Sequence, residues 1–217
     1  SYELLREIAG RQEDDLRDAL DQLTESELIF RRGTLPNATY VFKHALVQDA
    51  AYASLLKSRR QQLHANIARA LMELRQDLVD TQPELLAHHF TQAGLAEPAL
   101  EYWQAAANRA ISRSAHREAV EQRDQALAQI ALLPPGEARD RRELELQVLK
   151  PGPIFPVQGY GSPEVDESST RALIPGRTVG DDKTLFPTLS ARLAFPYINI
   201  HQKEMFGRSP EDLDRPN

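Results

Sequence analysis

The chain has 217 residues, 41% of them apolar and 27% charged, which is the composition of an ordinary globular protein. Its 26 basic and 32 acidic residues give a net charge of -6, which disfavours unspecific binding to nucleic-acid phosphates and anionic membrane surfaces. The lack of cysteine excludes disulfides and thiolate zinc sites, and without a bilayer-spanning apolar run or a hydrophobic signal segment we expect a cytoplasmic protein.

Two helices and a β-hairpin are predicted at the start of the chain. The first helix carries its apolar residues on one face and stops at Gly10. A second amphipathic helix is predicted over 12–25, with acidic residues at its positive N-terminal end. Short β-type runs at 28–30 and 39–42 enclose turn residues. This order is typical of a winged helix whose usual first helix would lie before Ser1.

The helical period returns at His44 and continues through several segments. Apolar residues spaced by three and four predict either two helices or one long helix that bends near 57–60. Pro83 suits the first turn of the next helix, which runs to Gly94. Short connections between helices of this length favour antiparallel neighbours.

The helices predicted over 97–113 and 116–130 fit the template of a tetratricopeptide (TPR) hairpin. Small residues allow two helices to approach closely. The template positions are occupied by Trp103, Ala106, Ala107, Ala110, Ala119 and Ala126. Arg123 interrupts the apolar stripe of the second helix, and we expect its charged end to snorkel to solvent.

Together these elements predict a mainly α fold. A partial winged-helix module with one short β-hairpin is expected over 1–57, and TPR-like antiparallel helical hairpins that form an α-solenoid over 58–133. Residues 134–217 are rich in proline and glycine, although 141–149 still has a helical pattern. We interpret that last region as an incomplete repeat array with an irregular tail.

Two long stretches resemble a known family. YVFKHALVQDAAYASLLKSRRQQLHANIARAL at 40–71 and QPELLAHHFTQAGLAEPALEYWQAAANRA at 82–110 are similar to proteins in which a class III adenylate/guanylate cyclase precedes a STAND-type AAA ATPase and TPR repeats. GYGSPEV at 159–165 and LFPTL at 185–189 extend the resemblance, which is lost after about Ala194.

The resemblance implies that the cyclase and the phosphate-binding loop lie N-terminal to this chain, and that the winged helix relays nucleotide state to the repeats. No glycine here belongs to a G-x-x-x-x-G-K-[ST] loop, and no paired metal-binding carboxylate motif can be identified. We therefore expect a non-catalytic regulatory segment without a cofactor. Its expected partner is a protein or a neighbouring ATPase domain of a parent, and not a membrane.

Four residues are predicted to form a domain contact or a partner surface: His44, Asp49, Tyr52 and Tyr102. His44 and Asp49 suggest a general base, but residues five apart on a helix point in different directions. The resemblance places His44 at a helix start, which favours a structural cap or a domain contact. Trp103 falls on the apolar stripe and should pack in the core, whereas Tyr102 is one step around the helix.

His88 and His89 raise the question of a metal site. Adjacent helical residues diverge by about 100°, so the two side chains cannot readily bind one ion. A zinc site would need further ligands from elsewhere in the chain. A partly buried packing histidine is the simpler interpretation.

A winged helix also raises the question of DNA, because its second helix commonly enters the major groove. Here that helix and the residues after it carry seven acids and one base: Glu13, Asp14, Asp15, Asp18, Asp21, Glu25 and Glu27 against Arg17. Such a surface repels a duplex, so no direct nucleic-acid binding is expected. The basic residues at 31–32 and 57–60 are interpreted as solvated surface.

Three alternatives stay open at this point. The chain could belong to a STAND-type transcription regulator whose DNA-binding domain lies outside it. A second alternative is a hydrolytic or metal-dependent enzyme that uses the histidines, which is weakened because no cluster of catalytic or metal-binding residues can be identified. The chain could also be a truncated remnant, in which case exposed apolar ends would favour self-association.

Overall fold

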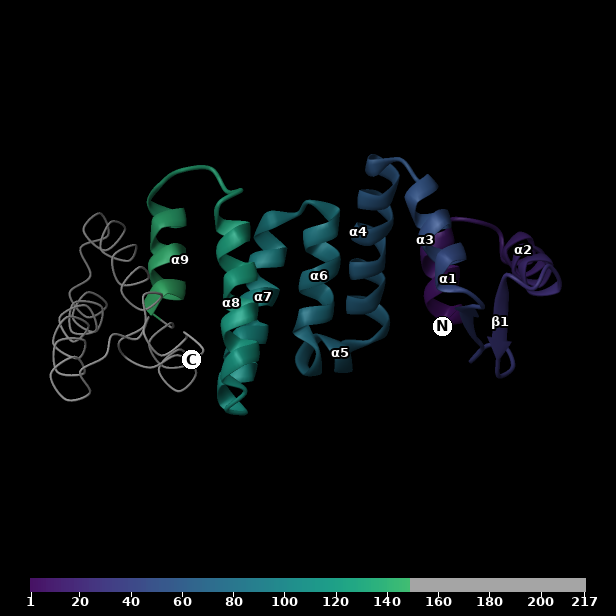
Figure 1. Cartoon of the computed structure of the whole chain (residues 1–217), viewed down its shortest axis with the longest axis horizontal. Helices are drawn as coiled ribbons and strands as arrows, with labels where there is room; N and C mark the ends of the chain where they lie inside the picture. The colour runs from purple at the N-terminus through teal and green to yellow at the C-terminus, as the bar shows by residue number, and fades with distance from the viewer. Residues whose placement is uncertain (149–217) are drawn as a thin grey trace, which may run out of the picture. The chain divides into compact units, whose positions relative to one another are not determined.

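The computed structural model describes residues 1–148 of the chain, and the predicted elements after 148 lie outside the described residues. The chain divides into two compact units, one from Ser1 to Ala99 and the other beginning at Leu100. The predicted mainly α fold with one short antiparallel β-hairpin is confirmed (Figure 1).

The first unit begins with the helices and strands of the predicted winged-helix order. In chain order they are α1 (Tyr2–Ala9), α2 (Glu13–Glu25), β1 (Ile29–Arg32), β2 (Thr39–Phe42), α3 (Ala45–Ser54), α4 (Lys57–Leu74), α5 (Gln76–Thr81) and α6 (Pro83–Ala93). Two glycines end helices in the left-handed conformation, as the sequence predicts: Gly10 after α1 and Gly94 after α6. Pro83 occupies the first turn of α6, where the missing N–H costs nothing.

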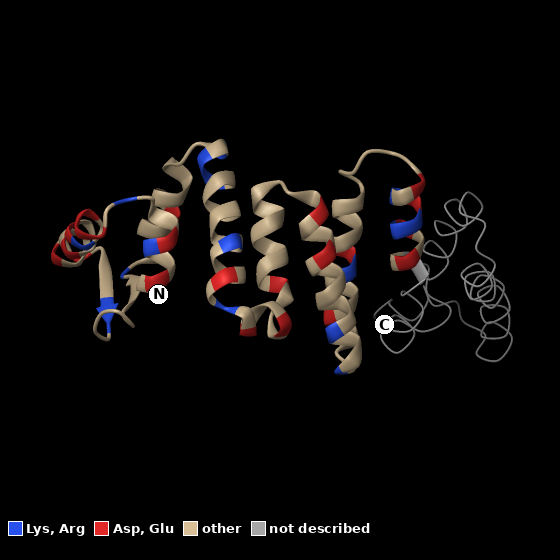
Figure 2. Cartoon of the chain, turned by 180° about the vertical axis from the view of Figure 1, so that it is seen from behind, with Lys and Arg blue, Asp and Glu red and all other residues tan. Residues whose placement is uncertain are grey.

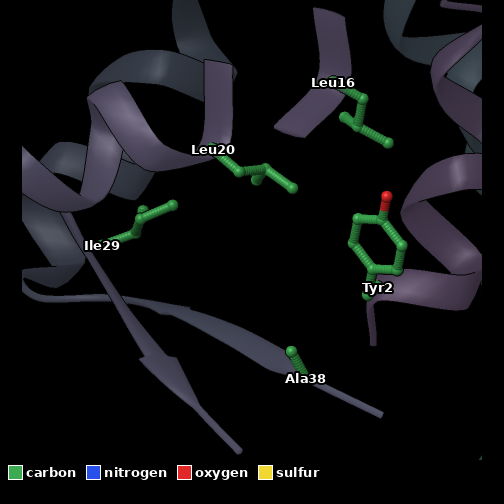
Figure 3. Packing of buried hydrophobic residues seen from close by; sticks show 5 residues of the cluster. All are labelled: Tyr2, Leu16, Leu20, Ile29 and Ala38. Carbon is green, nitrogen blue, oxygen red and sulfur yellow. The ribbon is translucent and has the colours of Figure 1, made fainter. Parts of the chain in front are cut away.

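A small apolar core holds the first three elements together. Five buried side chains meet there (Figure 3): Tyr2, Leu16, Leu20, Ile29 and Ala38. The Tyr2 backbone N–H donates to the Ala38 carbonyl at 2.8 Å, which ties α1 to the segment before β2. The Tyr2 hydroxyl also donates to Glu13 and accepts from Arg17, so a buried phenol keeps its polar end satisfied.

The β-hairpin is antiparallel, with Ile29 opposite Phe42 and Arg32 opposite Thr39. Of β1, only Ile29 is buried, and the hairpin leaves Phe30, Val41 and Phe42 exposed. The hairpin therefore contributes Ile29 to the core, with Tyr40 packed against it, and presents its other apolar side chains to solvent.

Residues 44–74 form two helices rather than one bent helix, because the chain becomes extended at Leu55 and Leu56 before α4 begins. α4 packs against α1 on one side and against α5 and α6 on the other. Its buried residues are mostly alanines, which allow this close approach. The short helix α5 was not predicted from the sequence.

The described part of the second unit contains most of α7 (Ala96–Ser112), and all of α8 (His116–Ile130) and α9 (Glu137–Val148). A core forms from Leu100, Ala126, Ile130 and Leu146, with Trp103 packed against it, so the predicted core role of Trp103 is confirmed. The alanines of the TPR template are buried, as expected: Ala106, Ala107, Ala110, Ala119 and Ala126.

Arg123 departs from its prediction. Its side chain is only 5% exposed, so the expectation that it snorkels to solvent is wrong. One terminal nitrogen donates to Asp124 at 2.6 Å, whereas its Nε and Nη1 atoms have no hydrogen-bond partner. Ala119 and Ala126 precede and follow Arg123 on the same buried stripe, which explains why its charged end stays inside.

Candidate functional site: a groove beside α3

α3 is an apolar helix that buries none of its own residues. Its main packing partner is β2, and Leu46 at its start and Leu56 just after its end are 81% and 77% exposed. Single exposed leucines are common on protein surfaces, whereas a contiguous apolar patch marks a contact surface. The apolar residues of α3 and Leu56 are therefore left in solvent within the first unit.

Beside α3 lies a groove that we divide into two compartments. The apolar compartment has a volume of about 720 Å³ and is lined from β2, α3, α4 and α6 by Phe42, Gln48, Asp49, Ala51, Tyr52, Leu55, His64, His88 and Gln92. The basic compartment has a volume of about 410 Å³ and is lined by Tyr52, Lys57, Arg60, Gln61, Thr91 and Gln92. Tyr52 and Gln92 line both compartments, so the two are neighbours beside α3.

A chain of hydrogen bonds crosses the floor of the groove. The Tyr52 hydroxyl of α3 lies 3.0 Å from Nε2 of His64 on α4. Nδ1 of His64 lies in turn 2.9 Å from Nδ1 of His89 on α6. A hydrogen bond between two Nδ1 atoms needs a proton on one of them and a lone pair on the other. The pair is therefore intact only when at least one ring is neutral.

The surroundings of these histidines keep them neutral. Burial lowers the pKa of His89 to about 4, helped by the neighbouring rings of His64 and His88. Burial and the proximity of His88 lower the pKa of His64 as well. Desolvation thus disfavours the charged imidazolium of both His64 and His89.

The cations of the basic compartment have few partners within the described chain. The Arg60 guanidinium lies 5.3 Å from the centre of the Tyr52 ring, a cation–π contact. Lys57 and Arg60 take part in none of the ion pairs of residues 1–148, and no acid lines this compartment. The compartment is thus a positively charged hollow.

The predicted site residues fall in different places. Asp49 and Tyr52 both line the apolar compartment. His44 is the N-cap residue of α3, as its position suggested, but its side chain makes no capping hydrogen bond. Tyr102 belongs to the second unit, where burial and the charge of Glu101 raise the pKa of its phenol.

The contact between His64 and His89 has no signal in the sequence. The two residues are 25 positions apart, and His64 sits on an ordinary amphipathic helix. His88 and His89 were considered together because they are adjacent, whereas contact across α4 and α6 decides their environment. Within the described residues no group of three or more metal-ligating side chains is present, and no helix is long and apolar enough to cross a membrane.

Comparison with known proteins gives one relative of note. No protein-family model and no solved structure matches the chain. This chain is 34% identical over 104 residues to an uncharacterized protein of Rhizobium meliloti (strain 1021). That stretch is 48% of this chain and 10% of the relative, so the chain spans about a tenth of a protein of roughly 1,000 residues.

Proposed function

We propose that this chain is a non-catalytic regulatory and protein-interaction segment of a cyclase-linked signalling ATPase. The observation that carries the proposal is α3, an apolar helix with no buried residue beside an open groove. In a protein of several domains, a neighbouring domain would cover this face. The partner that we propose for it is the ATPase domain of the same parent, in the cytoplasm.

The order of the elements supports this proposal. Two helices, a hairpin and a further helix precede helical hairpins, which fits a winged helix followed by TPR-like repeats. The relative is about ten times longer than the stretch it shares with this chain, which leaves room for catalytic domains. In such a protein the first unit would read the state of the ATPase, and the hairpins would present it to partners.

The proposal is tested in the intact relative. The residues of the relative that align with Leu46 and Leu56 are replaced by serine. If these positions fall outside the stretch shared with this chain, the whole shared stretch is deleted instead. We expect the wild-type relative to hydrolyse ATP and to form a cyclic nucleotide, and its ATPase rate to change severalfold when the apolar face is lost. A relative that neither binds nor hydrolyses ATP contradicts the proposal.

A matched control separates this role from a loss of folding. Serine at the position of Leu132, which is exposed in the second unit, should leave the ATPase rate unchanged. If both changes alter the rate equally, the effect does not come from the α3 face.

The second candidate is a segment of a STAND-type transcription regulator. The winged-helix order of the first five elements favours it, whereas the acidic surface of α2 requires the DNA-binding domain to lie elsewhere. Sequence-specific DNA binding by the intact relative, without cyclase activity, would favour this candidate over the first.

A further inference from the structure

The β-hairpin has one face toward the core and one face toward solvent. Side chains alternate between the two faces of a strand, and residues directly opposite each other on paired strands share a face. Ile29 lies in the core of the first unit, and Tyr40 packs against the same core. Phe30 and its partner Val41 therefore point to the opposite side, where they are 48% and 42% exposed. This outer face of the hairpin is open to solvent.

The apolar side chains of the outer face form one patch. Leu28 continues the pairing beyond β1, because its carbonyl accepts from the Lys43 N–H at 3.0 Å. Leu28 therefore shares the face of Phe30, two residues on, and it is 37% exposed. The Nζ atom of Lys43 lies 5.4 Å from the centre of the Phe30 ring, which places both side chains on this face. Leu28, Phe30 and Val41 thus form a contiguous apolar patch, which marks a contact surface.

The two ends of this patch carry different charges. Figure 2 shows basic residues at the far end of β1 and acidic residues along α2, which precedes the strand. Arg32 shares the face of Phe30 at the far end, and it takes part in none of the ion pairs of residues 1–148. At the near end, the Glu27 carboxylate pairs with Lys43 at 2.9 Å, yet the Glu27 side chain is 78% exposed and can accept a second donor. The patch therefore runs from an exposed acid to a cation without an ion pair in the described chain.

Two copies of this face complement each other in one orientation. If they pack face to face about a two-fold axis that runs across the strands, β1 lies against β1 of the other copy with its direction reversed. Phe30 is midway between Leu28 and Arg32, so it meets its own copy at the axis. Arg32 of each copy then lies beside Leu28 and Glu27 of the other. An axis along the strands would instead gather both Arg32 side chains at one end, so charge favours the reversed arrangement.

We propose that the chain forms a dimer through the outer face of its β-hairpin. Phe30 and Val41 of the two copies form the centre of the contact, and Arg32 of each copy pairs with Glu27 of the other. The same surface is used on both copies, so association is closed and stops at two chains. Few side chains take part, so the contact is weak, with a dissociation constant of about 10–100 µM. The contact uses no residue of α3, so it does not depend on the proposed contact with an ATPase domain.

Sedimentation equilibrium of the full chain at about 5–500 µM tests the dimer, because this range spans the expected dissociation constant. We expect the mean molar mass to rise with concentration and to level off at twice that of one chain. Phe30→Ser should abolish association over the whole range, because it removes the centre of the patch. Leu46→Ser, the same kind of change at an exposed leucine of α3, should dimerise like the wild type, which separates this contact from the proposed ATPase contact.

Charge reversal tests the orientation of the two copies. Arg32→Glu and Glu27→Arg each set like charges against each other at both ends of a homodimer, so each variant alone should associate about tenfold more weakly. An equimolar mixture of the two variants should associate like the wild type, because a mixed pair has opposite charges at both ends. Arg69→Glu, a charge reversal on the exposed side of α4, should leave association unchanged.

Three outcomes overturn the proposal. The wild-type chain could stay monomeric up to the highest concentration. The mean mass could rise past that of two chains, or Phe30→Ser could associate like the wild type, and either result places self-association on another surface. The mixture of charge variants could fail to associate although both keep the wild-type circular dichroism spectrum and melting temperature, in which case Arg32 of one copy does not meet Glu27 of the other.

Discussion

His64 and His89 each place Nδ1 toward the other, and this arrangement depends on their protonation. The 2.9 Å contact joins α4 to α6, the most closely packed pair of helices in the first unit. Few charged or titratable groups lie near the contact between His64 and His89. Arg60 stacks on Tyr52, Asp49 lines the groove, and His88 lies next to both histidine rings. None of these compensates for two imidazolium charges.

We expect the first unit to lose stability on acidification. The pKa of His89 falls from the ordinary 6.5 to about 4 in the folded chain. Between these two pH values the unfolded chain therefore binds more protons than the folded chain. The stabilisation is complete above pH 6.5 and is lost as the pH falls toward 4. After allowance for solvent screening, it amounts to about 1 kcal/mol. Urea unfolding at pH 7.5 and pH 5 measures it.

Two substitutions check this assignment. His89→Gln should flatten the pH dependence of the free energy of unfolding, because glutamine does not titrate. His44→Gln should leave it unchanged, since His44 is exposed and its side chain makes no capping hydrogen bond. Equal effects of the two substitutions would contradict the role of the histidine pair.

Arg123 presents the opposite case, a charge that stays buried with incomplete hydrogen bonding. Burial lowers the pKa of its guanidinium, although the bond to Asp124 opposes the shift. We expect Arg123→Met to raise the free energy of unfolding of the second unit by about 1 kcal/mol, because an apolar side chain of similar length removes the desolvation cost. Arg117→Met on the exposed side of α8 is the control, with a change within about 0.5 kcal/mol. A loss of stability in Arg123→Met alone would show that the guanidinium makes a net favourable contact.

At the scale of the elements, the helical period of the apolar residues predicts those helices that bury one face. α6 begins at Pro83 and α8 at His116, as predicted. The proline marks the start of α6 in the sequence. α5 was missed because six residues are too few to show a helical period. The sequence leaves the break between α3 and α4 open, because the backbone becomes extended at Leu55 and Leu56, two leucines that also suit a helix.

The groove could not be predicted because it is assembled from four elements. Phe42, Asp49, His64 and Gln92 come from β2, α3, α4 and α6, so no spacing along the chain connects them. Asp49 and Tyr52 are predicted contact residues, and their place in one groove depends on how α3 lies against its neighbours.

The core around α2 should respond to substitutions according to burial. Leu20 is 6% exposed and Leu23 is 40% exposed on the same helix. We expect Leu20→Ala to destabilise the first unit by about 2–4 kcal/mol, and Leu23→Ala by less than about 1 kcal/mol. Hydrogen exchange followed by mass spectrometry should show faster exchange in α1, α2 and the hairpin of the Leu20 variant. Similar values for both substitutions would mean that this core does not form.

For the whole molecule, charge decides which partners are accessible. With a net charge of -6 and an acidic α2, the chain should bind a labelled 20-base-pair duplex with a dissociation constant weaker than about 100 µM at 50 mM NaCl. Fluorescence anisotropy measures this. Replacement of Asp14, Asp15 and Asp18 by lysine should tighten binding, because repulsion from α2 is then removed. Micromolar binding by the wild-type chain would contradict this account of the winged-helix surface.

The attachment of α3 has a consequence for motion. The helix contacts mainly β2, and a hydrogen bond between Tyr52 and His64 connects it to α4. Its amide protons are therefore expected to exchange through a local opening that leaves α4 and α6 folded. Such an opening would remove one wall of the groove while the rest of the unit stays folded, so exchange in α3 should be faster than in α4 and α6.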